Sequence, residues 1–218
     1  MINYQLIRSK RKTLSLQIDA QARLSVRAPM RLSVKKIENF INEKQNWIQK
    51  KQAEIKSKIP PEQNYEAGNQ YLFLGKSYSL QHSESGNPLS FDGKNFQLNI
   101  EYEGNAAFHW FYKKEFIKTT TPILEKLAKK YSLDYKEVRF KAQKTRWGSC
   151  SASNNINLNY LLMMAPMSVI EMVIAHELAH IVHKNHSKDF YQLLTTMMPE
   201  HKQADVWLKA HSQTLHNL

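Results

Sequence analysis

Residues 168–182 read SVIEMVIAHELAHIV, and this stretch decides how the C-terminal half of the chain folds. Ser168 and Glu171 have the spacing of a capping box, which predicts that a helix begins there. Apolar residues lie on nearly every side of the helix that would follow, so we expect it to be buried. His176 and His180 would then share one face of that helix, about 6 Å apart along its axis.

Two imidazoles at this spacing can bind one metal ion, because both rings can approach it to about 2.1 Å. The residue after His176 is Glu177, which would be placed to take a proton from a water on the metal. The alternative is a pair of buried histidines that hydrogen-bond to backbone or carboxylate groups. A metal satisfies these buried polar groups more completely, so the stretch predicts a metal site.

A catalytic zinc site needs a third protein ligand, and two further histidines follow the helix. His183 lies on the same face as His176 but one turn further along, which places it too far from the ion. His186 comes after Asn185, which can adopt the left-handed conformation that ends a helix. Such a chain reversal would bring His186 back to the metal, with Ser187 capping the next helix. We therefore predict His186 as the third ligand and assign His183 to the surroundings of the site or the surface.

Several motifs in order along the chain resemble the YgjP-like zinc metallopeptidase family. They are RWGSC at 146–150, INLN at 156–159, HELAH at 176–180, and NHS at 185–187 with Phe190. The stretches 8–15 and 40–47 are also similar to that family, and Tyr191 departs from it where relatives usually have Trp. The resemblance implies a minimal gluzincin-like core with a small sheet, an active-site helix and a following helix. It implies His176, His180 and His186 as ligands of one Zn²⁺ per chain and Glu177 as the catalytic base. Similar cores occur in SprT-like and WLM proteases, which act on proteins crosslinked to DNA.

Two other interpretations of the same region are weaker. The histidine spacing also matches metzincins, but those need a glycine where this chain has His183, and Met197-Met198 are more typical of core packing. Ser149 and Cys150 have no neighbouring feature that would activate a nucleophile. We expect a strand there, with Gly148 allowing it to approach the helix closely.

The rest of the chain predicts an α+β protein with a β-rich, basic N-terminal part. Alternating residues at 14–18 and 24–28 indicate a β-hairpin, and Ser33 is a plausible cap for an amphipathic helix that Pro60-Pro61 would end. We expect Trp47 to anchor the core. Strands are expected at 71–80, at 89–102 around the Asp92-Gly93 turn, at 138–140 and at 156–160, with a helix from about residue 106 kinked near Pro122. We place the domain boundary at residue 104, with a basic part at 1–104 and a catalytic domain at 105–218.

The charge of the chain is unevenly distributed. The net charge is +12, and residues 1–60 hold 14 Lys or Arg against 4 acids, a net +10. A field of that sign attracts nucleic acid, nucleotides or acidic protein surfaces, although it also serves solubility alone. Cys150 is the single cysteine, so no internal disulfide is possible, and no apolar run approaches the length of a membrane span. These features favour the cytoplasm, and they say nothing about oligomeric state.

The prediction is a zinc-dependent hydrolase, most simply a metallopeptidase that cleaves peptide bonds with Glu177 moving the proton. Arg146 and Tyr160 are candidates to stabilise an oxyanion, although no spacing singles them out. A second hypothesis is hydrolysis of nucleoside triphosphates at the same metal, with the basic N-terminal part gathering phosphates. A third is a nucleic-acid-binding protein with a structural zinc. No Walker loop or acidic Mg²⁺ cluster is present, which ranks the nucleotide reaction second.

Overall fold

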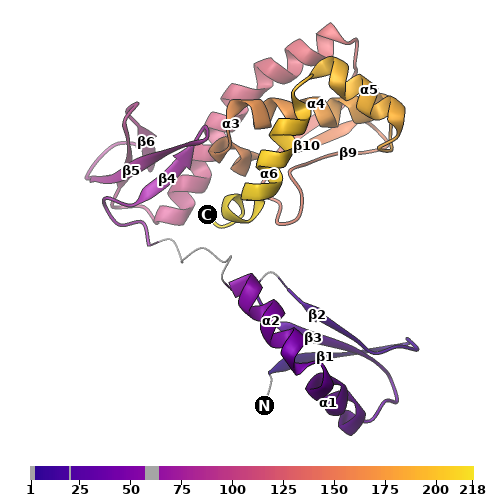
Figure 1. Ribbon diagram of the computed structural model, residues 1–218. Helices are drawn as coiled ribbons and strands as arrows, with labels where there is room; N and C mark the ends of the chain where they lie inside the picture. The colour runs from indigo at the N-terminus through magenta and orange to yellow at the C-terminus, as the bar shows by residue number, and fades with distance from the viewer. Residues whose placement is uncertain (1–2, 20, 57–63) are drawn as a thin grey trace. The chain divides into compact units, whose positions relative to one another are not determined.

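The computed structural model describes residues 3–19, 21–56 and 64–218 and is a mixed α+β structure, as the sequence predicts (Figure 1). Contacts between Cα atoms divide the chain into two compact units, Met1–Pro61 and Glu62–Leu218. This division falls before the boundary that the sequence suggests at residue 104. Residues 64–103 form a small sheet whose apolar side chains join the core of the second unit, so they group with the half that contains the HELAH stretch.

The N-terminal unit is a three-stranded sheet covered on one face by two helices. The hairpin predicted at 14–18 and 24–28 is confirmed, and an unpredicted first strand pairs in parallel with its second arm. The strand order is β1-β3-β2. The elements are β1 (Tyr4–Ser9), β2 (Ser15–Ile18), β3 (Leu24–Pro29), α1 (Val34–Glu43) and α2 (Gln45–Lys56).

The core of this unit comes from alternate residues of β3 and one stripe of the helices. Six side chains are at most 3% exposed: Leu24, Val26, Ala28, Ile37, Ile41 and Ile48. The predicted cap is confirmed, because Ser33 Oγ accepts from the backbone N–H of Lys36. The single predicted helix is instead two, since α1 ends at the Lys44 cap. Trp47 is 49% exposed, so its prediction as a core anchor is wrong. Ile48 points into the core, and Trp47, the residue before it on the helix, therefore points about 100° away from the core.

The second unit begins with a four-stranded sheet of order β4-β5-β7-β6. The run expected as one strand at 71–80 forms two, because Leu74 and Gly75 both have positive φ and turn the chain. A side chain at Gly75 would meet Pro166 Cγ at 2.7 Å, so the turn packs directly against the start of a later helix. The Asp92-Gly93 turn is confirmed, with Asp92 Oδ1 accepting from two backbone N–H groups. The strands are β4 (Gln70–Phe73), β5 (Lys76–Ser83), β6 (Leu89–Phe91) and β7 (Asn95–Asn99).

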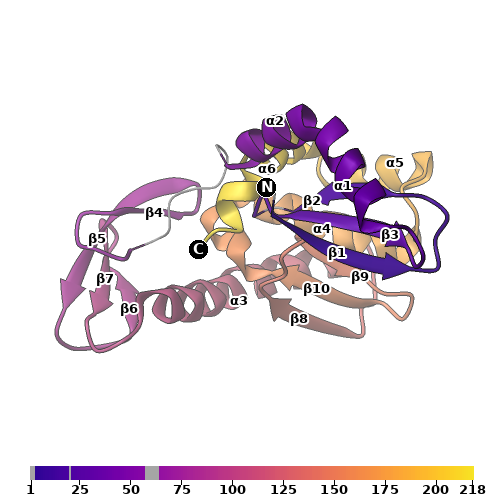
Figure 2. The ribbon, with the colours of Figure 1, turned by 90° about the horizontal axis from the view of Figure 1, so that it is seen from below.

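A long helix, α3 (Gly104–Lys130), connects this sheet to the rest of the unit. Glu103 caps it by accepting from the N–H groups of Asn105 and Ala106. The helix continues through Pro122, and its apolar face packs on α4 (Met167–Val182) and on the short helix η1 (Tyr160–Met164). Figure 2 shows the four-stranded sheet at the first end of α3 and the second sheet nearer the other end. No helix in the described residues is long and apolar enough to cross a membrane.

The second sheet has the order β8-β10-β9, and β10 runs parallel to β8 and antiparallel to β9. The expected strands at 138–140 and 148–150 are confirmed, and Asn154 makes the turn with a φ of 58°. The strand expected at 156–160 ends at Asn159, because Tyr160 begins the short helix η1. The elements are β8 (Glu137–Lys141), β9 (Gly148–Cys150), β10 (Asn155–Asn159), α4 (Met167–Val182), α5 (Lys188–Met197) and α6 (His201–Leu215). Helix α4 contacts α3, α5, α6 and β9, so the HExxH stretch lies at the centre of this unit.

The start of α4 differs from the prediction. The helix begins at Met167, with Pro166 as its N-cap and no side-chain cap. Ser168 therefore lies within the first turn, where it cannot cap, and the predicted capping box is wrong. Pro166 has a φ of −56° and a ψ of 150°, outside the helical region, and its carbonyl oxygen accepts from the backbone N–H groups of Val169 and Ile170.

Candidate metal centre

The first two histidines project from the buried helix α4. His176 and His180 are one turn apart, and their ring centroids are 4.9 Å apart at nearly a right angle. Val173, Ile174, Leu178 and Ala179 are at most 3% exposed and fix the helix in the core. The two imidazoles are partly buried on the remaining face, which is the arrangement that the spacing predicts.

The third histidine returns to this face after α4 ends. His186 Nε2 lies 3.1 Å from His176 Nε2, and one nitrogen from each of the three rings lies within 4.8 Å of the others. Among the described residues, this group contains His176, His180 and His186 and leaves out His183. Two nitrogens bound tetrahedrally at about 2.1 Å would be about 3.4 Å apart, so the cluster is close to the geometry of one ion.

The chain reversal is made differently from the prediction. Asn185 does not adopt a left-handed conformation; helix α4 ends at Val182, and His183 has extended backbone angles. The next helix then begins at once, because Ser187 accepts from the N–H of Phe190, as the sequence predicts. Phe190 is fully buried, and its ring centroid lies 4.5 to 5.0 Å from those of all three histidines. This ring holds the three imidazoles together from one side.

A backbone carbonyl orients one of the ligand rings. His180 Nδ1 lies 2.9 Å from the carbonyl oxygen of His183. Because a carbonyl only accepts, Nδ1 carries the proton and donates it, which leaves the Nε2 lone pair of His180 for a metal. Sequence reasoning considered only the side chain of His183, and no side-chain pattern could reveal the role of its backbone.

Burial keeps His176 and His180 in the neutral form that binds metals. Desolvation, together with the neighbouring histidines, lowers the pKa of His176 to about 4. Desolvation also lowers the pKa of His180. A neutral imidazole offers a lone pair without first losing a proton, so the cluster is ready to bind a cation at neutral pH.

Glu177 lies beside the cluster in a nearly closed environment. Its side chain is 5% exposed, and among the described residues Oε2 is buried without a hydrogen-bond partner. Burial raises the pKa of Glu177 to about 8, although Arg146 opposes this shift. A buried carboxyl group with an unused oxygen is costly for folding and is typical of a functional group that awaits a ligand.

Strand β9 packs directly against this carboxylate. A Cβ atom at Gly148 would meet Glu177 Oε1 at 2.5 Å and Cγ at 2.7 Å. The predicted close approach at Gly148 is therefore confirmed, and the group approached is Glu177 itself. Only glycine leaves room for the carboxylate in this position.

Four other residues were candidates for a nucleophile or for stabilising an oxyanion. Cys150 is partly buried, and desolvation raises the pKa of its thiol, which disfavours a nucleophilic thiolate. Ser149 Oγ accepts from Asn157 across the sheet. Tyr160 OH lies 3.1 Å from His109 Nδ1, so this hydroxyl is already engaged. Arg146 is exposed and is close enough to affect the pKa of Glu177.

A groove of about 680 Å³ begins next to the third histidine, a feature that the sequence analysis missed. Tyr191 lines it, and the ring of this residue lies 6.2 Å from that of His186 and 6.4 Å from that of His201. The groove contains two lysines and a histidine and no acid. Its lining residues are Lys188, Tyr191, Gln192, Thr195, Thr196, His201 and Lys202.

Three imidazoles that could hold a metal ion converge beside the buried Glu177 side chain, in an α+β protein with an HExxH motif. Residues 12–211 match the family model described as "YgjP-like, metallopeptidase domain", so this chain belongs to the YgjP-like family. The family resemblance predicted from the ordered motifs is thus confirmed.

The chain is also similar to a curated protein of Escherichia coli (strain K12) named UTP pyrophosphatase. The two are 35% identical over 65 residues, which is 28% of this chain and 39% of that protein. The match thus spans less than half of the length of the relative.

Proposed function

We propose that this protein is a zinc-dependent metallopeptidase. The observation that carries the proposal is the buried Glu177 carboxylate, whose Oε2 has no hydrogen-bond partner among the described residues and which directly follows His176. A structural zinc would be expected to have four protein ligands, whereas three histidines gather here, which favours catalysis over a structural role.

The three histidines would hold the ion, and their nitrogen donors suit zinc better than magnesium. A bound zinc ion would act as a Lewis acid and increase the acidity of a water molecule. Glu177 Oε2 would take the proton of that water during attack and return it to the leaving nitrogen. Gly148 leaves space for this carboxylate, and the His183 carbonyl keeps the His180 ring in its orientation.

Replacing Glu177 by glutamine tests this assignment. Glutamine keeps the shape of the side chain but cannot take up a proton, so we expect zinc content to be unchanged and kcat to fall by about 10²–10⁴-fold. Zinc per chain would be measured by atomic absorption, and hydrolysis on casein and on a crosslinked protein. Turnover at the wild-type rate in the zinc-loaded variant would exclude Glu177 as the base.

A second candidate, hydrolysis of a nucleoside triphosphate, is favoured by the relative named UTP pyrophosphatase. The acid-free groove with Lys188, His201 and Lys202 beside His186 could accept phosphate groups. Assaying nucleoside triphosphates and casein in parallel, with zinc and with manganese, separates the two reactions. Release of pyrophosphate with no cleavage of protein, abolished in Glu177→Gln, would replace the peptidase proposal by this one.

A further inference from the structure

The fold of the N-terminal unit joins two basic segments at one end of its sheet. Residues 8–12 and 27–36 carry four cations each and no acid. Ser9 is opposite Pro29 in the parallel pairing of β1 with β3. Arg8 Nη1 also donates to the carbonyl oxygens of Pro29, Met30 and Leu32 at 2.9 to 3.0 Å. The turn after β1 and the turn after β3 are therefore held side by side (Figures 1 and 2).

We call this surface the basic end. Arg8 is used in joining the two turns, and the other seven cations are left at the surface, six of them exposed and Arg11 partly buried. The basic end consists of Lys10, Arg11, Lys12, Arg27, Arg31, Lys35 and Lys36.

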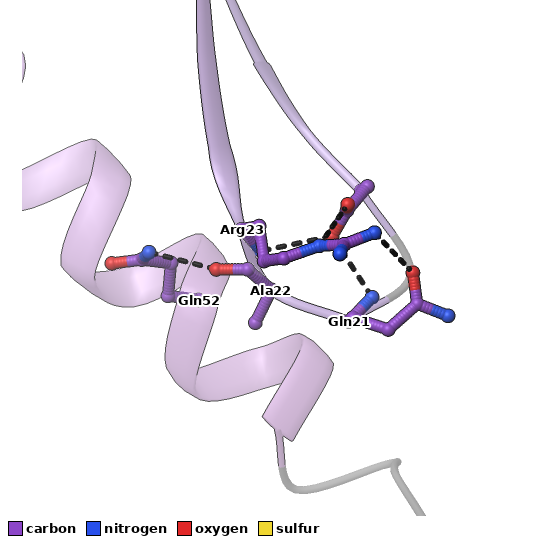
Figure 3. Close-up of polar contacts among 5 residues, drawn as sticks. Gln21, Ala22, Arg23 and Gln52 are labelled. Carbon is purple, nitrogen blue, oxygen red and sulfur yellow. Dashed lines mark hydrogen bonds and ion pairs between the residues drawn. The ribbon is translucent and has the colours of Figure 1, made fainter. Parts of the chain in front are cut away.

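Two of the four acids of this unit pair with cations outside the basic end. Asp19 follows β2 at the opposite end of the sheet, where its carboxylate pairs with Arg23 at 2.7 Å. Figure 3 shows Arg23 in this turn. It also shows Gln52, whose side chain donates to the carbonyl oxygen of Ala22. Glu54 pairs with Lys51 on α2. Among the residues that the structure describes, no ion pair of this unit involves a cation of the basic end. The two basic segments therefore hold 8 of the 14 cations of residues 1–60.

Arg11 adds a group suited to phosphate. Its Nη2 donates to Thr13 Oγ1 at 3.2 Å, and its Nε is buried without a partner among the described residues. The planar fork of an arginine suits phosphate oxygens, and in Arg11 the outer nitrogens carry this role because the buried Nε is closed to an outside ligand. The chemistry of the basic end thus fits a ligand with closely spaced phosphates.

We propose that the basic end binds nucleic acid through its phosphate backbone, independently of the reaction at the metal centre. An anionic membrane is the other large polyanion, but a surface helix that binds lipid exposes an apolar face. The apolar face of α1 is already used in the core, with Ile37 and Ile41 at most 3% exposed. At the basic end only Met30 and Val34 are exposed large apolar residues. This leaves little apolar surface that could insert into a membrane.

The test measures binding of the full chain to a short fluorescein-labelled duplex DNA over a range of salt concentrations. Each phosphate contact lowers the slope of log K against log salt by about 0.9. Lys10→Gln/Lys12→Gln/Arg31→Gln should therefore make the slope shallower by about 2–3 and weaken binding by about tenfold or more. The matched control is Lys44→Gln/Lys50→Gln/Lys56→Gln, which removes the same charge from exposed positions of the same unit. This control should bind nearly as the wild type does.

Three results would overturn the proposal. Equal weakening by both triple variants would show an effect of net charge rather than of this surface. Binding to anionic vesicles, with no binding to DNA or to RNA of the same length, would assign the surface to membranes. Absence of binding to either polyanion at low salt would remove a ligand role. Glu177→Gln should bind DNA as the wild type does, so the outcome is separate from the test of hydrolysis.

Discussion

The two units of this protein divide charge and chemistry between them. The N-terminal unit carries +10 of the net +12 and has six fully buried apolar side chains in its core. The second unit has 17 basic and 15 acidic residues, yet it buries Glu177, His201 and Asn159 inside a much larger core. The difference shows that the strongest charge in a sequence need not mark the reactive site.

The size of the core explains this division. Burying a carboxylate or a histidine without its water costs free energy, which many apolar contacts must offset. Helix α4 is surrounded by α3, α5, α6 and β9 and can supply those contacts. A small sheet covered by two helices cannot, so its polar groups stay at the surface.

The largest effect should come from the third ligand. We expect His186→Ala to weaken zinc binding by more than about 100-fold, because two imidazoles alone do not complete the site. His183→Ala is the matched control, since alanine keeps the backbone carbonyl that binds His180. Zinc affinity would be measured by competition with a chelator. Equal retention of zinc by the two variants would mean that His186 is not a ligand.

A core substitution in the N-terminal unit should lower stability and leave zinc binding unchanged. Ile37 is completely buried, so Ile37→Ala should cost about 2–5 kcal/mol of stability in the N-terminal unit and leave zinc content unchanged. Urea denaturation followed by circular dichroism measures the first effect and atomic absorption the second. Loss of zinc from the folded variant would show that the two units are coupled.

Gly148→Ala should separate metal binding from catalysis inside the second unit. The new methyl group would meet Glu177 Oε1 at 2.5 Å, so the carboxylate must move. A displacement near 1 Å can lower kcat by about 100-fold, whereas the histidines are not touched. Steady-state kinetics with the zinc-loaded variant would check this. Unchanged kcat would indicate that Glu177 need not be held in place.

The smallest effect is a pH dependence of the metal-free protein. The pKa of Glu177 is raised from 4.5 to about 8, so between these values the folded state holds a proton that the unfolded state has lost. Stability therefore falls as pH rises through this window. Below pH 6.5 the lowered pKa of His176 has the opposite effect, because there the unfolded state binds a proton that the folded state does not. The two effects oppose each other below pH 6.5, so the loss of stability is left between pH 6.5 and 8, where it amounts to about 1–2 kcal/mol.

Urea denaturation at several pH values with a chelator present measures this slope, and Glu177→Gln should flatten it. Asp19→Asn is the control, because the pKa of Asp19 is lowered and its titration is complete well below this window. A slope that survives in Glu177→Gln would assign the effect to another group.

Local patterns in the sequence predict most of the elements. Ser33 and Ser187 cap helices as expected, and the Asp92-Gly93 turn forms where its residue types favour it. The failures occur where tertiary contacts override local preference. Ser168 has the spacing of a cap, but the turn at Gly75 packs against Pro166 and the helix begins there.

The histidine cluster could be predicted because a helix fixes the spacing of His176 and His180 and a short connection limits where His186 can go. The contact of Gly148 with Glu177 joins residues 29 positions apart, and the groove beside Tyr191 depends on the packing of two helices. Trp47 shows another limit, since it and Ile48 are both apolar neighbours on one helix and only the packing decides which of them points into the core. Features made by distant segments need the three-dimensional structure.

The contact between His180 and the carbonyl of His183 makes position 183 misleading in a mutational scan. Every amino acid has this carbonyl, so replacement of the side chain would score as neutral although the residue orients a ligand ring. Only a change in the main chain would reveal its contribution. Replacing the amide between His183 and Lys184 by an ester, whose carbonyl is a poorer acceptor, would weaken the hold on His180 without altering any side chain.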